Sequence, residues 1–151
     1  MKILLSLCLF FYCPIGICAV DFFYLTETGK DKIKISLEDL KAMPTYSFKT
    51  STNYTTEEIF LGVKIYDLVE KYKIEGKLIR AFAWDDYSYS MPIDEMIQYN
   101  VILAYQKGGV DMDIKSFGPF AIIYPRDIYP ELSQRDVNAK TVWQIRLLEI
   151  K

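Results

Sequence analysis

The sequence predicts an α+β domain with a mixed sheet and short helices. Three observations favour this class. Strand-like segments outnumber helical ones, the helical segments are short, and the two types are mixed without a strict strand–helix–strand alternation. A doubly wound α/β fold is the alternative, but the glycine-rich phosphate loop that is typical of that fold is missing.

The segment from residue 21 to residue 54 predicts a lead-in, a short helix and a strand. The lead-in, residues 21–34, ends in alternating Lys and Ile, which is typical of a strand. Ser36 is a suitable N-cap for the helix, and Pro44 ends it. Residues 45–54 are rich in Thr, Tyr, Phe and Ser, which favours a strand.

A second helix is predicted after residue 64, with Gly76 as its stop signal. We expect the segment Phe60-Leu61-Gly62-Val63 to bend the chain into this helix, and Glu57 and Glu58 to complement its dipole. One helix face would carry the apolar residues Ile65, Leu68, Val69 and Tyr72.

The second half of the chain predicts strands joined by turns, with one more short helix. Asp85-Asp86 is the tight turn of a hairpin, and Pro92 opens a helix that runs to Tyr99. The expected strands cover residues 77–84, 87–91, 101–106, 120–124 and 142–150, and residues 126–140 form a long polar loop.

The N-terminus predicts that the protein is exported. Lys2 gives a short positive start, residues 3–17 carry no charge, and Ala19 is a small residue that suits a cleavage site. We expect residues 1–19 to be a signal peptide and residues 20–151 to be a single domain, periplasmic or secreted. An uncleaved N-terminal anchor is the alternative. A lipoprotein cut before Cys18 is disfavoured, because a bulky isoleucine precedes that cysteine.

Removal of the leader limits the available chemistry. All three cysteines lie in it, and the chain contains no histidine, so the mature domain has no thiolate, imidazole or disulfide. The part after residue 19 carries 17 basic and 20 acidic residues without a basic run, which argues against nucleic-acid binding. No membrane span is expected after cleavage. Ser-His-Asp, Cys-His and HExxH sets are absent, so hydrolase and transferase activities are disfavoured.

Four segments of the chain, taken in order, carry a family resemblance. They are Phe60–Val69, Ala83–Tyr87 with Met91-Pro92-Ile93, Val101–Tyr105 with Gly108, and Gly118-Pro119-Phe120 through Tyr124-Pro125 with Trp143. This ordered set resembles the oxidoreductase molybdopterin-binding domain, which has the sulfite-oxidase-like fold. The resemblance covers about residues 46 to 150.

The resemblance implies a fold more clearly than an activity. In catalytic members of that family a cysteine thiolate ligates molybdenum, and arginine and histidine side chains help to hold the pterin. No cysteine remains here after cleavage, and carboxylate is no substitute for a soft thiolate. We therefore expect no catalytic residue, metal or cofactor, and a domain that binds a ligand or a partner. The alternative is a molybdopterin-dependent oxidoreductase, or a subunit that helps to enclose the cofactor.

Aromatic and basic residues give the candidate binding site. The predicted hairpin gathers aromatic side chains, which suit planar ligands and partner surfaces, and the long loop carries arginines that suit an anionic ligand. The candidates are Trp84, Tyr87, Tyr89, Tyr105, Arg126 and Arg135. The alternatives are ordinary sheet residues and surface charges that serve solubility. The expected partner is a small anionic or planar ligand, or an envelope protein; a purely structural subunit of an envelope complex is a third possibility.

Two acidic pairs have structural and functional interpretations. Asp85 and Asp86 favour a turn over an acid–base or cation site, because adjacent turn residues point in different directions. Asp111 and Asp113 have the spacing to face one side of a strand and bind Ca²⁺, but a solvated face is favoured, since no further ligands follow at loop spacing.

Overall fold

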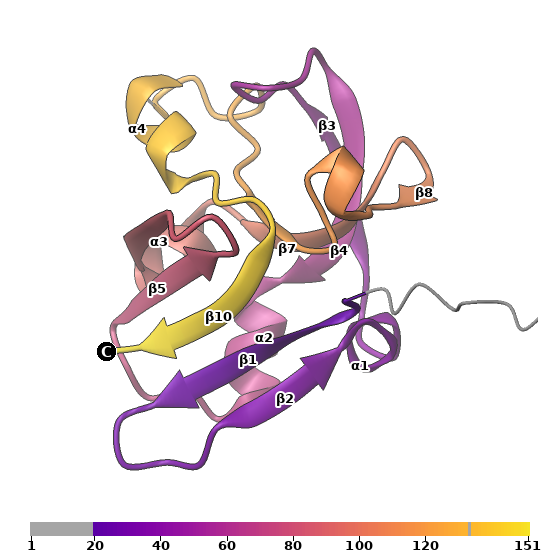
Figure 1. Ribbon diagram of the computed structural model, residues 1–151. Coiled ribbons are helices and arrows are strands. Elements are labelled where there is room, and N and C mark those ends of the chain that lie inside the picture. Colours follow the sequence, from indigo (N-terminus) through magenta and orange to yellow (C-terminus); the bar gives the residue numbers. More distant parts are fainter. Residues whose placement is uncertain (1–19, 133) are drawn as a thin grey trace, which may run out of the picture.

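The computed structural model describes residues 20–132 and 134–151 and shows an α+β fold with two sheets and short helices (Figure 1). The expected signal peptide, residues 1–19, lies outside the described residues. Of the helices that the structure describes, none has the length and apolar character needed to cross a membrane.

The first sheet is mixed, as predicted. It pairs β1 with β10 in parallel, and its other pairs are antiparallel. In spatial order its strands are β2 (Ile33–Ser36), β1 (Phe22–Glu27), β10 (Ile145–Ile150), β5 (Leu78–Ala83) and β6 (Ser88–Pro92). The expected lead-in, residues 21–34, contains β1 and the start of β2. Its side chains alternate, and Phe23 and Leu25 are buried in the core.

The second sheet is antiparallel. Its strands are β3 (Tyr46–Thr50), β4 (Glu58–Lys64), β7 (Ile102–Lys107) and β8 (Val110–Asp111), and β9 (Ala121–Ile123) also pairs with β7. The two sheets enclose the main hydrophobic core. Phe60, Ile102 and Trp143 belong to a smaller second cluster.

The prediction that residues 60–63 bend into a helix is wrong, because these residues lie within β4. Gly62 pairs with Ala104 of β7, and a Cβ at Gly62 would overlap the carbonyl of Leu103. The glycine therefore permits close approach of two strands. Glu58 begins the strand and Glu57 forms a salt bridge with Lys49, so neither complements the helix dipole as expected.

The helices are short and largely as predicted. Ser36 and Asp39 form a reciprocal capping box at the start of the first helix. The second helix ends at Tyr72. Its C-cap, Lys73, has a left-handed backbone conformation, so the helix stops before Gly76. The helices are α1 (Leu37–Lys41), α2 (Ile65–Tyr72), α3 (Ile93–Gln98), α4 (Gln134–Lys140) and the 3₁₀ helix η1 (Ile114–Ser116).

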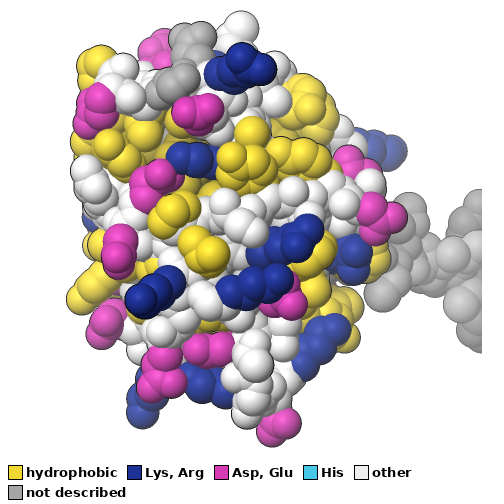
Figure 2. Space-filling view, turned by 90° about the vertical axis from the view of Figure 1, so that its left-hand side faces the viewer, with side chains coloured by type: hydrophobic (Ala, Val, Ile, Leu, Met, Phe, Trp, Pro, Cys, Tyr) yellow, Lys and Arg dark blue, Asp and Glu magenta, His cyan; other side chains and the backbone are white. Residues whose placement is uncertain are grey.

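The long polar loop is only partly a loop, because α4 occupies its second half. Figure 1 shows α4 and the connection between β3 and β4 at the same, upper end of the molecule, above the start of β10. On the face shown in Figure 2, hydrophobic side chains gather toward this upper end among some charged ones, and charged side chains are also spread over the lower half. These loops and α4 position the candidate site.

Candidate functional site

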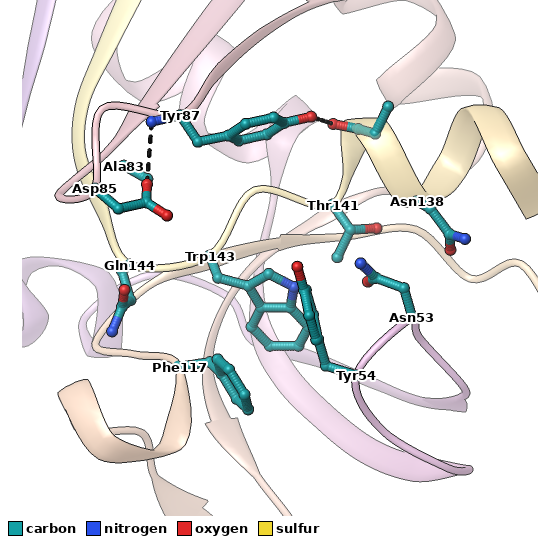
Figure 3. Close-up of a pocket in the computed structure, with 11 residues that line it drawn as sticks. Asn53, Tyr54, Ala83, Asp85, Tyr87, Phe117, Asn138, Thr141, Trp143 and Gln144 are labelled. Atoms are coloured by element: carbon teal, nitrogen blue, oxygen red, sulfur yellow. Dashed lines mark hydrogen bonds between the residues drawn. The ribbon is translucent and has the colours of Figure 1, made fainter.

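A pocket of about 460 Å³ lies at this upper end, which is within the about 300–1,000 Å³ usual for small-molecule sites. Four segments build it: the β3–β4 connection, the β5–β6 turn, the residue after η1, and α4 with the segment that leads into β10 (Figure 3). Its lining residues are Asn53, Tyr54, Ala83, Asp85, Tyr87, Phe117, Asn138, Ala139, Thr141, Trp143 and Gln144.

Three aromatic rings form one wall of the pocket. The centroids of Tyr54 and Phe117 are 5.3 Å apart, with the rings nearly parallel at 22°. Trp143 meets Tyr54 edge-on at 6.1 Å and Phe117 at 5.5 Å with a tilt of 53°. These contacts have the geometry that aromatic quadrupoles favour, so the wall is a packed unit.

Trp143 carries a buried hydrogen-bond donor without a partner. Its side chain is 7% exposed, and Nε1 makes no hydrogen bond to any described residue. The edge-on contact with Tyr54 supplies at most a weak N–H···π interaction. An unsatisfied buried donor costs roughly 1–3 kcal/mol. Figure 3 shows the ring nitrogen on the side of the indole that faces Tyr54. The site therefore gains from any acceptor that reaches this nitrogen.

The polar side chains of the lining are mostly held in place. Thr141 donates its hydroxyl to the Val137 carbonyl at 2.7 Å, and Tyr87 donates to the Ala139 carbonyl at 2.7 Å. Burial raises the pKa of the Tyr87 phenol, so that it remains a neutral donor. Both hydroxyl oxygens keep lone pairs that a ligand can use.

Arg126 links two walls of the pocket from behind. Its guanidinium donates to Ser51 Oγ and to the Thr52 carbonyl in the β3–β4 connection, at 2.8–3.1 Å. Nη1 donates to Asn138 Oδ1 of α4 at 2.8 Å. The side chain is only 10% exposed. Because Asn138 Oδ1 accepts from Arg126, the side-chain Nδ2 of Asn138 is free to donate to a ligand in the pocket.

The lining of the pocket lacks the positive charge expected for a site that binds an anion, as judged from the described residues. Asp85 is the one formally charged residue among the described lining residues. Arg126 lies behind the wall, and Arg135 is exposed on α4 outside the lining. The fold therefore does not bring the two loop arginines into this pocket.

The predicted aromatic residues fall into three different environments. Tyr87 lines the pocket, whereas Trp84 is 49% exposed in the adjacent turn and is not part of the lining. Tyr89 is half-buried against the main core. Tyr105 is 3% exposed within that core, where burial raises the pKa of its phenol.

Sequence reasoning missed the aromatic wall. Tyr54 and Phe117 lie in connections far from Trp143 along the chain, and only the folded loops bring them together. Trp143, which the sequence places in the closing strand, lies just before β10.

The acidic pairs have structural roles. Asp85 accepts a hydrogen bond from the Tyr87 backbone N–H, which confirms the turn. Asp111 contacts Lys41 at 2.8 Å and accepts from Gln106, and these bonds lower its pKa. Asp113 caps η1, and the Ser116 backbone N–H lowers its pKa. The described part of the chain contains no cluster of three or more acidic, cysteine or histidine residues that could hold a metal ion.

A partly buried ion pair holds α4 beside the pocket. Lys140 Nζ contacts both carboxylate oxygens of Glu95 at 2.8 and 2.9 Å, and Tyr124 donates to the same carboxylate at 3.0 Å. Burial, together with the Glu95 charge, raises the pKa of the Tyr124 phenol far above its usual value. The network joins α3, α4 and the segment after β9.

Comparison with solved structures supports the fold relationship at a distance. The chain is similar to a chain in the crystal structure of the sulfane dehydrogenase SoxCD from Paracoccus pantotrophus, with a TM-score of 0.64, 15% sequence identity and coverage of 85% of this chain. The match covers 37% of that chain, so this protein spans little more than a third of its neighbour's length. No protein-family model and no curated protein sequence matches. The likeness to this sulfane dehydrogenase chain is one of fold alone.

Proposed function

We propose that the protein is an exported, non-catalytic domain that binds a small, uncharged ring-shaped molecule in the pocket at its upper end. The observation that carries the proposal is the buried, unpartnered Nε1 of Trp143 in the pocket wall. A ligand acceptor at this nitrogen would offset the cost of the unsatisfied donor. The aromatic wall supplies apolar contact area, and the fixed polar groups supply orientation.

The side chains of the described residues do not fit a molybdenum–pterin centre. That centre needs a soft thiolate, and every cysteine of the chain lies at or before position 18. Among the described residues that line the pocket, none is basic and could meet the phosphate of a pterin cofactor. The fold is therefore compatible with a binding role that does not depend on a redox metal.

Native mass spectrometry tests the binding role directly. The protein, purified after expression of the full chain in an exporting host, is compared with the Trp143→Phe and Tyr54→Ala variants. We expect wild type to retain a small molecule that both variants lose. Tyr66→Ala is the matched control, because Tyr66 is 49% exposed and lines a different groove on α2. Equal ligand occupancy in all four proteins, or none in wild type, would contradict the proposal.

The second candidate is a molybdopterin-dependent oxidoreductase, or a subunit that encloses its cofactor. The likeness of the fold to a chain of a sulfane dehydrogenase is the observation that favours it. In that case the thiolate would come from the leader or from a partner chain. The molybdenum content of natively produced protein separates the two candidates.

A further inference from the structure

We infer that the ligand is a neutral saccharide, bound as a non-planar, hydroxylated ring. This inference rests on the proposed function, because it names the class of molecule that the same pocket takes. Three features of the pocket carry it: the angles between its aromatic rings, the mixture of hydrogen-bonding groups, and the charge of its lining.

The aromatic wall is not a slot for a flat molecule. A planar ring held between two aromatic faces needs about 3.5–4.0 Å of carbon–carbon contact on each side, and so roughly 7 Å between the faces. The nearly parallel pair, Tyr54 and Phe117, has centroids only 5.3 Å apart and is already stacked on itself. Trp143 lies at 53–74° to both. The wall thus offers one-sided contact, which suits the C–H face of a sugar ring.

The polar groups provide both donors and acceptors. Trp143 Nε1 and Asn138 Nδ2 are donors, and the Nδ2 orientation is set by the bond from Arg126 to Oδ1. Thr141 and Tyr87 have committed their hydroxyl protons and keep acceptor lone pairs. Gln144 donates through Nε2 to the Ile114 carbonyl, which leaves its oxygen as an acceptor. A hydroxyl group both donates and accepts, so a polyhydroxylated ring can satisfy this mixed set.

The charge of the lining selects against acidic sugars. Asp85 contributes the one formal charge among the described lining residues, and it is negative. A uronic or sialic acid would bring a second carboxylate into the pocket without a cation to pair with it, which is unfavourable. Neutral hexoses, N-acetylhexosamines and their disaccharides remain.

Tyr54 is the residue that must move for the inference to hold. Nε1 of Trp143 is covered, and the Tyr54 ring lies against the indole. Tyr54 is 60% exposed and belongs to a connection rather than to a strand. A small shift of its ring along the face of Phe117 would open Nε1 to a sugar hydroxyl and keep the aromatic contact on one side of the sugar.

Indole N–H resonances give the test. The chain has two tryptophans, Trp84 and Trp143, so a ¹H–¹⁵N spectrum of the full-chain product shows two indole signals, which the Trp84→Phe variant assigns. The probes are glucose, galactose, N-acetylglucosamine, maltose and chitobiose, with glucuronate, adenosine and uracil as comparisons. We expect at least one neutral sugar to shift the Trp143 signal saturably, and glucuronate to bind about ten-fold more weakly than glucose or not at all.

The outcomes separate this inference from the proposed function. Saturable shifts with adenosine or uracil but with no sugar would overturn the saccharide assignment and leave the binding role intact. No shift with any probe, in a protein that retains a small molecule in native mass spectrometry, would also overturn the saccharide assignment. No shift together with an empty native spectrum would overturn both. Because Trp143→Phe removes the reporter itself, Thr141→Val is the second variant, and we expect it to weaken sugar binding about ten-fold with an unchanged spectrum of the free protein.

Discussion

Arg126 donates through Nη1 to Asn138 Oδ1 at 2.8 Å, and this single contact joins α4 to the β3–β4 connection that the same guanidinium holds. The pocket exists between these two segments. The sequence places Arg126 in a polar loop, where it invites interpretation as a ligand contact. The structure gives it a positioning role behind the wall.

The first prediction concerns this arginine. Arg126→Ala removes hydrogen bonds from a charged donor that is 10% exposed, and leaves the Thr52 carbonyl and Asn138 without their partner. We expect unfolding free energy to fall by about 2–4 kcal/mol, and ligand affinity to fall with it. Arg135→Ala, on the exposed side of α4, should change stability by less than about 0.5 kcal/mol. Similar stabilities for the two variants in urea denaturation would show that Arg126 does not brace the pocket.

The second prediction distinguishes a strand from a helix at Gly62. In a helix, Gly→Ala stabilises by about 1 kcal/mol. In β4, the added Cβ meets the Leu103 carbonyl and lies 2.6 Å from Ala104 Cα. We expect Gly62→Ala to destabilise by more than about 3 kcal/mol, or to prevent folding. Gly29→Ala is the control: it has open space but a φ of 80°, so a cost of about 1 kcal/mol is expected. A stabilised Gly62→Ala protein would contradict the strand.

The third prediction concerns alkaline stability. Burial raises the pKa of Tyr124 in the folded state, while the unfolded phenol titrates near its usual value of about 10. Above that pH the unfolded state loses a proton that the folded state keeps, so stability is complete below about pH 10 and falls as pH rises beyond it. The Tyr124 contribution to the slope is at most about 1.4 kcal/mol per pH unit.

Tyr124→Phe is the variant that isolates this effect. It should be less stable at neutral pH, because it removes the hydrogen bond to Glu95, yet its stability should fall less steeply above pH 10. Tyr72, Tyr87 and Tyr105 also have raised pKa values, so a residual slope remains in the variant. Identical slopes in the two proteins would place the Tyr124 phenol in solvent rather than in the core.

The fourth prediction separates stability from binding at Trp143. Trp143→Phe leaves a small cavity, which lowers the unfolding free energy. The same substitution removes an unsatisfied buried donor, which raises the unfolding free energy and partly offsets the loss. We expect the net change in unfolding free energy to stay within about 1.5 kcal/mol, while ligand retention is lost. Trp84→Phe, at a side chain 49% exposed, should leave both unchanged. A loss above about 3 kcal/mol for Trp143→Phe would mean that Nε1 has a partner in solution.

Local patterns predicted most of the helices and strands, and nonlocal contacts explain what they missed. The capping box of Ser36 and Asp39 and the turn at Asp85 depend on neighbours within three residues, so both were predictable. The local sequence around Gly62 resembles the entry to a helix. The glycine is needed because β7 approaches closely, and β7 lies some forty residues away along the chain. Tyr105 was a candidate for ligand binding, but it is buried in the core. The local sequence pattern of a strand does not distinguish a buried tyrosine from an exposed one.

The candidate site was the least predictable part. Tyr87 was found from the hairpin, but Tyr54, Phe117 and Trp143 meet only after two loops fold over the start of β10. No periodicity links them. The role of Arg126 likewise depends on partners 12 and about 75 residues away.

We propose that this α+β domain, whose fold is similar to part of a sulfane dehydrogenase chain, binds its ligand without a thiolate-held metal. The most direct test is elemental and pterin analysis of the protein purified from its native host, with mass spectrometry to locate the N-terminus of the purified chain. We expect a chain that starts near residue 20, contains molybdenum at less than about a tenth of an equivalent, and releases no pterin fluorescence. One equivalent of molybdenum with a pterin, on a chain that retains Cys18 or is bound to a cysteine-bearing partner, would contradict it.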